Sequence, residues 1–183
     1  MGRILTNNKL QYNNCWAAHA CISDGEGTMT ATIIQFMALL LVALLVGALF
    51  GILIGFNPAD LSPGAYVEQQ QHAIRALNTF MPLLGAVCIV LTIVLAILSK
   101  EDRAARYLFL AAAACLIVAG VVTRFGNQPI NSVVMTWAPQ TPPSNWAELR
   151  DHWWQWHIVR TVSGIAALCL LIWAVLLQRN PSR

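Results

Sequence analysis

Six residues near the C-terminus of the chain recur at alternating steps of four and three. They are Trp146, Arg150, Trp153, His157, Arg160 and Gly164. Such steps return to the same face of an α-helix. An ionised side chain placed in lipid is costly, at roughly 2.5–3.5 kcal/mol for an arginine at the centre of a membrane helix. We therefore expect this face to line a bundle interior or a cavity, where imidazole and guanidinium groups can exchange protons and hold anions.

Polar residues on two other predicted helices converge on the same level. One stripe, again at steps of four and three, consists of Glu68, His72, Arg75, Thr79 and Pro82. Beside this stripe, Asn78 is level with His157 when both are counted from the inner helix ends at about 1.5 Å per residue. A third helix is predicted to end near Arg124, which is followed by Asn127 and Asn131. This convergence indicates a polar pocket near one face of the membrane.

Simpler interpretations of these residues stay open. The arginines can extend to lipid phosphates, and the histidines can be hydrogen-bonded residues of the interface. The tryptophans can form an aromatic belt at the membrane surface. The asparagines can cap turns and helix ends in a loop.

The composition places these residues in a membrane protein. Of the 183 residues, 57% are hydrophobic and 10% are charged, whereas a soluble domain carries about a quarter charged residues. This excludes a soluble enzyme, and the small net charge of +3 gives no surface for nucleic acid. Four apolar stretches approach the roughly 20 residues that a membrane span needs, at about 33–56, 80–98, 107–123 and 156–177. We predict an all-α fold, a four-helix transmembrane bundle whose helices 2 and 4 extend beyond the outer face.

The domain organisation is predicted to be simple. Residues 1–30 form a polar N-terminal extension that we expect to be disordered, and residues 31–179 form a single four-span membrane domain. Basic residues without acidic neighbours gather on the side of the termini, so both termini are expected in the cytoplasm, at the cytoplasmic membrane if the source is bacterial. Gly47, Gly51 and Gly55 give the first span a face of small residues. Membrane lipid surrounds the bundle, and a homo-oligomer through this glycine face is a further expectation.

Two segments resemble a known family. RFGNQPINSVVMTW and PPSNWAELRDHWWQWHIVRTVSG are similar to the C-terminal signature of the anthrone-oxygenase-like integral membrane family, many of whose bacterial members are classed as a domain of unknown function. The pattern is an Asn-x-Pro-x-Asn run, a proline-rich loop, a Trp, and then Trp-x-x-x-His-x-x-Arg-Thr. It is met by Asn127, Pro129, Asn131, Trp146, Arg150, Trp153, His157, Arg160 and Thr161. The resemblance covers residues 35–177, and the C-terminal third is its distinctive part.

The resemblance implies an oxidoreductase, a monooxygenase that oxidises an anthrone or another hydrophobic phenolic molecule. O₂ would be the co-substrate, and no organic cofactor is recognised. In this interpretation His157 takes a proton, while Arg160 and Arg124 hold the anion that forms. The residues expected to bind the aromatic substrate are Asn127, Asn131, Trp146, Trp153, Arg150, Asn78 and Arg75.

Two alternatives remain at this stage. His72 and His157 could bind copper, iron or zinc, although the chain has no His-x-x-x-His pair or cysteine pair to strengthen that prediction. The protein could also be a non-catalytic membrane subunit or a scaffold that binds lipid or quinone. Its small size and the absence of a strong catalytic motif favour this second alternative.

Overall fold

The computed structural model describes the backbone of residues 3–179 and the side chains of residues 29–179. Helices account for all of its regular structure, and no strand occurs in the described part of the chain. The α-helices are α1 (Arg3–Gly55), α2 (Pro63–Leu77), α3 (Phe80–Leu98), α4 (Arg103–Val122), α5 (Gln128–Val134) and α6 (Trp146–Arg179). A short 3₁₀ turn, η1 (Pro58–Asp60), and a π-helical turn, η2 (Thr123–Asn127), lie between them.

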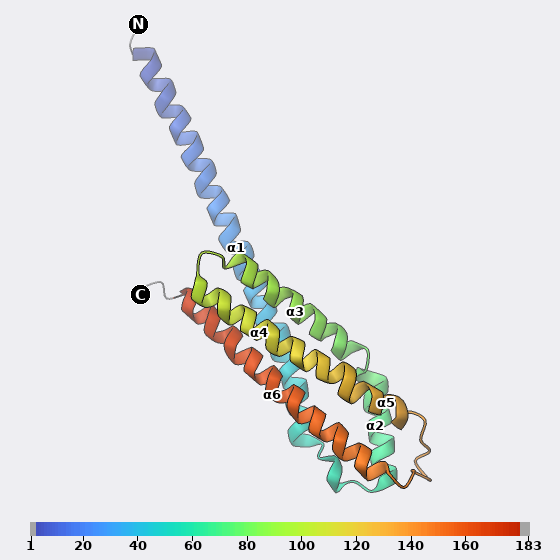
Figure 1. The fold of residues 1–183 in the computed structure, drawn as a ribbon. Helices are drawn as coiled ribbons and strands as arrows, with labels where there is room; N and C mark the ends of the chain where they lie inside the picture. Colours follow the sequence, from blue (N-terminus) through green and yellow to red (C-terminus); the bar gives the residue numbers. More distant parts are fainter. Residues whose placement is uncertain (1–2, 180–183) are drawn as a thin grey trace. The chain divides into compact units, whose positions relative to one another are not determined.

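The predicted all-α bundle with four apolar spans is confirmed. Four segments are long and apolar enough to cross a membrane, namely Met29–Asp60, Phe80–Leu98, Arg103–Val134 and Trp146–Arg179. Helix α4 packs along both α3 and α6, and α2 packs on α5 at one end of the bundle (Figure 1). Large apolar side chains such as Leu83, Ile97 and Trp173 are exposed on its outer surface, as expected for residues that face lipid.

The chain divides into two compact units, Met1–Phe36 and Met37–Arg183. The first unit includes the polar segment that the sequence predicted to be disordered, and its described backbone is helical from Arg3 onward. No proline interrupts this segment, so nothing in it forces the helix to end. The boundary of the membrane domain at residue 31 stays a prediction. Everything described below lies in the second unit.

The core of the second unit combines small and large apolar residues at helical spacing. On α4, Ala105, Phe109, Ala112 and Leu116 are buried at helical spacing. On α6 the buried face continues the polar stripe from His157 through Thr161, Gly164 and Ala167. A Cβ at Gly164 would lie 3.3 Å from a methyl group of Val46, so this glycine marks the close contact between α6 and the second half of α1.

The second predicted helix is interrupted. α2 ends at Leu77 with Asn78 as its C-cap, and α3 begins at Phe80. A continuous helix would need a backbone N–H at Pro82 to bond the carbonyl of Asn78, and proline has none. The stripe predicted to run from Glu68 to Pro82 as one helical face is therefore wrong beyond Asn78, because α2 and α3 are separate helices.

A π-helical turn joins α4 to α5. In η2 the backbone hydrogen bonds reach back five residues instead of the four of an α-helix. Such turns are frequent at functional sites. Gly126 is buried against α6, where a Cβ would lie 2.6 Å from Cγ of Trp156. Only glycine fits at this contact. The turn brings Thr123 and Asn127 to the inner side of the bundle.

Candidate functional site

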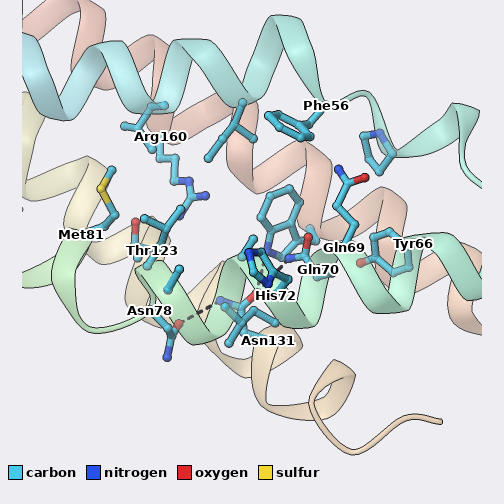
Figure 2. A pocket seen from close by; sticks show the side chains of 18 of the residues that line it. Phe56, Tyr66, Gln69, Gln70, His72, Asn78, Met81, Thr123, Asn131 and Arg160 are labelled. Carbon is cyan, nitrogen blue, oxygen red and sulfur yellow. Dashed lines mark hydrogen bonds between the residues drawn. The ribbon is translucent and has the colours of Figure 1, made fainter. Parts of the chain in front are cut away.

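A cavity of about 320 Å³ opens at the end of the bundle where α2 and α5 lie. Ligand pockets in proteins are typically about 300–1,000 Å³ and mostly apolar, and this one fits that description. Its apolar wall includes Phe56, Met81 and the ring of Trp153. Its polar lining consists of Tyr66, Gln69, Gln70, His72, Asn78, Thr123, Asn131 and Arg160. Figure 2 shows the labelled polar side chains around this space.

Arg160 is held in place by the buried ring of His157. Nε and Nη2 of Arg160 lie 3.1 and 2.9 Å from Nδ1 of His157, one helical turn away on α6. A guanidinium has only donors, so Nδ1 must be the acceptor and the neutral imidazole carries its proton on Nε2. This Nε2 is buried and has no hydrogen-bond partner in the described part of the chain. The geometry makes His157 a support for Arg160.

Three tryptophan contacts fix this pair. The ring of His157 stacks on those of both Trp153 and Trp154, with centroid distances of 5.2 and 5.5 Å. The guanidinium carbon of Arg160 lies 5.5 Å from the ring centroid of Trp153, within range of a cation–π contact. Arg160 is restrained by His157 and by the ring of Trp153, so its side chain loses little further conformational freedom when it binds a ligand.

No carboxylate neutralises Arg160. The single ion pair among residues 29–179 joins Arg150 to Asp151, with a separation of 2.8 Å. A half-buried cation beside an apolar wall is costly unless it is paired, because the low local dielectric penalises an isolated charge. The cavity therefore offers an anionic ligand a charge that no side chain already satisfies.

Asn131 organises a network of amides on the opposite wall. Its Oδ1 accepts hydrogen bonds from Nε1 of Trp153 at 2.8 Å and from Nε2 of Gln70 at 3.4 Å. Its Nδ2 donates to Oδ1 of Asn78 at 3.0 Å, which is the bond drawn in Figure 2. Gln71 ties α2 to the end of α5 by donating to the carbonyls of Val134 and Trp137. Most of the hydrogen-bond donors and acceptors of these amides are paired with one another, so the network positions α2 against α5 and α6.

The structure brings together only some of the residues predicted from the sequence. Arg160, Trp153, Asn131, Asn78 and His72 all line the cavity. His157 and Asn127 are fully buried but do not line it. The Nδ2 of Asn127 donates to the backbone carbonyl of Trp153 at 3.0 Å, which gives it a structural role in joining η2 to α6.

Four other predicted residues lie away from the cavity. Arg124 and Arg75 are exposed, and Arg150 contacts Asp151 and lies over the ring of Trp146 at 4.8 Å. The reason is helical geometry. Thr123 and Asn127 occupy the inner face of η2, so Arg124 points elsewhere, and the buried face of α2 carries Ile74, one residue from Arg75.

α2 places on the cavity a set of residues outside the predicted stripe. Tyr66, Gln70, Ala73 and Leu77 recur at steps of four, three and four, and all four line it. This helical spacing is the sequence signal that marks them, and it runs beside the stripe of charged residues. Glu68 and Arg75 of that stripe are exposed, and of its three charged or titratable residues only His72 reaches the cavity.

Tyr66 is the most deeply buried polar side chain on the α2 wall, with 1% of its surface exposed. Its hydroxyl has no hydrogen-bond partner among the described residues. Its ring packs against Trp146 with centroids 5.9 Å apart. Burial raises the pKa of Tyr66 well above its usual value, so the hydroxyl keeps its proton at neutral pH. Leaving such a group unpaired typically costs about 1–3 kcal/mol.

The residues do not form an evident metal site. No group of three or more His, Cys, Asp or Glu side chains in residues 29–179 lies close enough to hold an ion. Of the two predicted ligands, His157 has its Nδ1 bonded to Arg160, and His72 lies on the separate helix α2. The copper or iron alternative stays a prediction.

Comparison with known proteins gives one match. The model of a family described as anthrone oxygenase matches residues 71–170, which is more than half of the chain and includes η2, α5 and most of α6. No curated protein matches the sequence, and no solved structure matches the fold.

Proposed function

Because the chain belongs to the anthrone oxygenase family, we propose that it is a membrane-embedded oxygenase acting in the cavity of α1, α2, α3 and α6. Its substrate would be a hydrophobic phenolic or anthrone-type molecule, and O₂ the second substrate. The observation that carries the proposal is the uncompensated guanidinium of Arg160 on an apolar wall. An anthrone that loses a proton becomes a flat, apolar anion with its charge on oxygen, which suits that environment.

The reaction balances without another reagent. A base removes one proton from the doubly benzylic carbon, and the electron pair of the C–H bond is delocalised onto the oxygen that Arg160 holds. This carbon then bonds to O₂ and, after protonation, carries a hydroperoxide. Loss of its second proton breaks the O–O bond, which leaves a carbonyl on carbon and releases water. One oxygen atom of O₂ enters the product and the other leaves in water.

We assign the proton acceptor to His72 instead of His157. The only lone pair of neutral His157 is engaged by Arg160, so this ring cannot take a proton without releasing the guanidinium. His72 lines the cavity and makes no hydrogen bond within the described part of the chain. An imidazole is suited to exchange protons near neutral pH. In this proposal His157 orients Arg160.

The proposed cellular location is based on the apolar spans and the basic residues of the sequence. The four apolar spans indicate a membrane protein, and we propose the cytoplasmic membrane of a bacterium with both termini in the cytoplasm. The cavity would then lie near the outer leaflet. A hydrophobic substrate dissolved in the bilayer could reach its apolar wall directly.

The test uses the full-length protein purified in detergent. A hydroxylated anthrone is added, and O₂ uptake and quinone absorbance are followed after subtraction of the uncatalysed oxidation. We expect one O₂ consumed per quinone formed, and a fall of about 10²–10³-fold in kcat/KM for Arg160→Gln, as for the removal of other oxyanion donors. The matched control is Arg106→Gln, because Arg106 is exposed on α4.

Two outcomes would overturn the proposal. Wild-type protein that does not accelerate oxidation but still binds the quinone product would favour the alternative of a non-catalytic membrane subunit or a scaffold that binds lipid or quinone. Equal losses of kcat/KM in Arg160→Gln and Arg106→Gln would show that the cavity cation has no particular role.

A further inference from the structure

The hydroxyl of Tyr66 stands apart from the other polar groups of the cavity. The amides of Asn131, Gln70 and Asn78 bond one another, and Arg160 is bonded to His157. Tyr66 alone combines near-complete burial, a position on the cavity and a hydroxyl without a partner. Buried polar groups in proteins are nearly always hydrogen-bonded, so an exception on a cavity wall points to a ligand.

The ring that carries this hydroxyl is fixed. Ser62 caps the first turn of α2 by accepting a hydrogen bond from the backbone of Ala65, directly before Tyr66. Gly64 lies so close to the loop that a Cβ there would be 2.8 Å from the carbonyl oxygen of Pro139. Trp146 of α6 packs on the Tyr66 ring. The hydroxyl therefore cannot swing out to solvent without moving α2 or the loop.

The hydroxyl and the guanidinium lie on different walls. Tyr66 belongs to α2 and Arg160 to α6, and Figure 2 shows them on opposite sides of the labelled set, with Phe56 and His72 between. The wall that joins them is mostly apolar. Arg150 and Asp151 both act electrostatically on the Tyr66 hydroxyl, and these two residues are already paired with each other.

We propose that Tyr66 is a specificity-determining residue whose hydroxyl bonds an oxygen of the substrate at the end remote from Arg160. The substrate class is then a flat aromatic molecule with two separated oxygen functions at opposite ends of its ring system, one anionic at Arg160 and one neutral hydroxyl at Tyr66. This inference rests on the proposed function, since it takes the same cavity as the substrate site. It adds a requirement for a second oxygen that the proposed function does not contain.

The experiment measures binding with two product-like probes. One is an anthraquinone with a single hydroxyl at one end, and the other carries a second hydroxyl at the opposite end. Wild-type protein in detergent should bind the dihydroxy probe about tenfold more tightly, as expected for one additional hydrogen bond. In Tyr66→Phe that ratio should fall to about one, while the monohydroxy probe binds as before. Tyr107→Phe is the control, because Tyr107 is exposed on α4.

A second measurement separates a ligand contact from a structural one. Since the hydroxyl has no partner among residues 29–179, ligand-free Tyr66→Phe should have a Tm equal to or above that of the wild type. A lower Tm, or an unchanged preference for the dihydroxy probe, would overturn the inference. If the wild type binds neither probe, both this inference and the assignment of the cavity as the substrate site are overturned. Correct probe binding without O₂ consumption would refute the oxygenase alone.

Discussion

At the scale of single residues, the two histidines of the site differ in their hydrogen bonds: Nδ1 of His157 is engaged by Arg160, and His72 has no such bond in the described part of the chain. His157 carries the family pattern and sits at the centre of the α6 stripe, which is why the sequence indicated it as the base. Its Nδ1 accepts two N–H groups of Arg160, and its ring stacks on those of Trp153 and Trp154. His72 has neither restraint and faces the cavity. We therefore propose that proton transfer belongs to His72, which lies outside the residue pattern of α6.

Replacement of His72 tests this assignment. We expect His72→Gln to lower kcat by about 10²–10⁴-fold, the usual contribution of a general base, with little change in product binding. Added imidazole should restore part of the rate, and a substrate deuterated at the reacting carbon should slow the variant further. Turnover at the wild-type rate in His72→Gln would return the role of base to another group.

At the scale of elements, the turn η2 determines which residues of α4 and α5 face inward. Its wide π-helical geometry places Asn127 where it bonds the backbone of α6 and leaves Arg124 exposed. The contact that permits this is Gly126 beneath the indole of Trp156. The register of η2 against α6 thus depends on a residue without a side chain.

Substitution of Gly126 should be costly for that reason. Gly126→Ala places a methyl group 2.6 Å from Cγ of Trp156, so the indole or the helix must shift. We expect a loss of about 1–3 kcal/mol in the free energy of unfolding, typical of overpacking, and a lower Tm in detergent. Gly120→Ala on α4 is the control, because a Cβ there meets nothing within 4 Å and alanine favours the helix. Equal effects of the two substitutions would contradict the role of this contact.

The interruption between α2 and α3 is the other feature that determines which residues face the cavity. Pro82 prevents a continuous helix, and α2 is instead tied to α5 through Gln71 and to α6 through Trp146. Because of these contacts, α2 turns the face of Tyr66, Gln70 and Ile74 inward. The inward face of α2 forms one wall of the cavity, which α1, α3, η2, α5 and α6 complete.

At the scale of the whole molecule, the exposed apolar surface of the four spans requires a bilayer, and the distribution of basic residues indicates its direction. Lys100, Arg103 and Arg106 lie at the turn between α3 and α4. A Cβ added at Gly47, Gly51 or Gly55 would have no heavy atom within 4 Å. This face of α1 therefore does not pack against the described part of the second unit. The homo-oligomer through this face stays a prediction.

The orientation can be measured with reporter fusions in a bacterial host. Fluorescent protein fused to the C-terminus should fluoresce, and alkaline phosphatase fused there should be inactive, because we expect both termini in the cytoplasm. Phosphatase inserted in the loop at Thr141, between α5 and α6, should be active. The reverse pattern would place the cavity near the inner leaflet and would require a substrate from the cytoplasmic side.

The sequence by itself determined the fold class, the four apolar spans and the family. These follow from continuous hydrophobic runs and a local residue pattern, which do not depend on how the helices pack. The spacing of α6 also placed Trp153 and Arg160 on one inward face, as the structure has them.

Only the tertiary structure decided which polar residues meet. The inward face of α2 is set by its hydrogen bonds to α5. The outward direction of Arg124 is set by the packing of η2 on α6, through Gly126 against Trp156 and Asn127 against the Trp153 carbonyl. Both depend on contacts between residues far apart in the chain. For the same reason the sequence could not reveal that Arg160 donates to the only free lone pair of His157. Nor could it reveal that the Tyr66 hydroxyl lacks a hydrogen-bond partner in the described part of the chain. Helical periodicity gives the direction of a side chain around its own axis, but the position of that axis depends on packing.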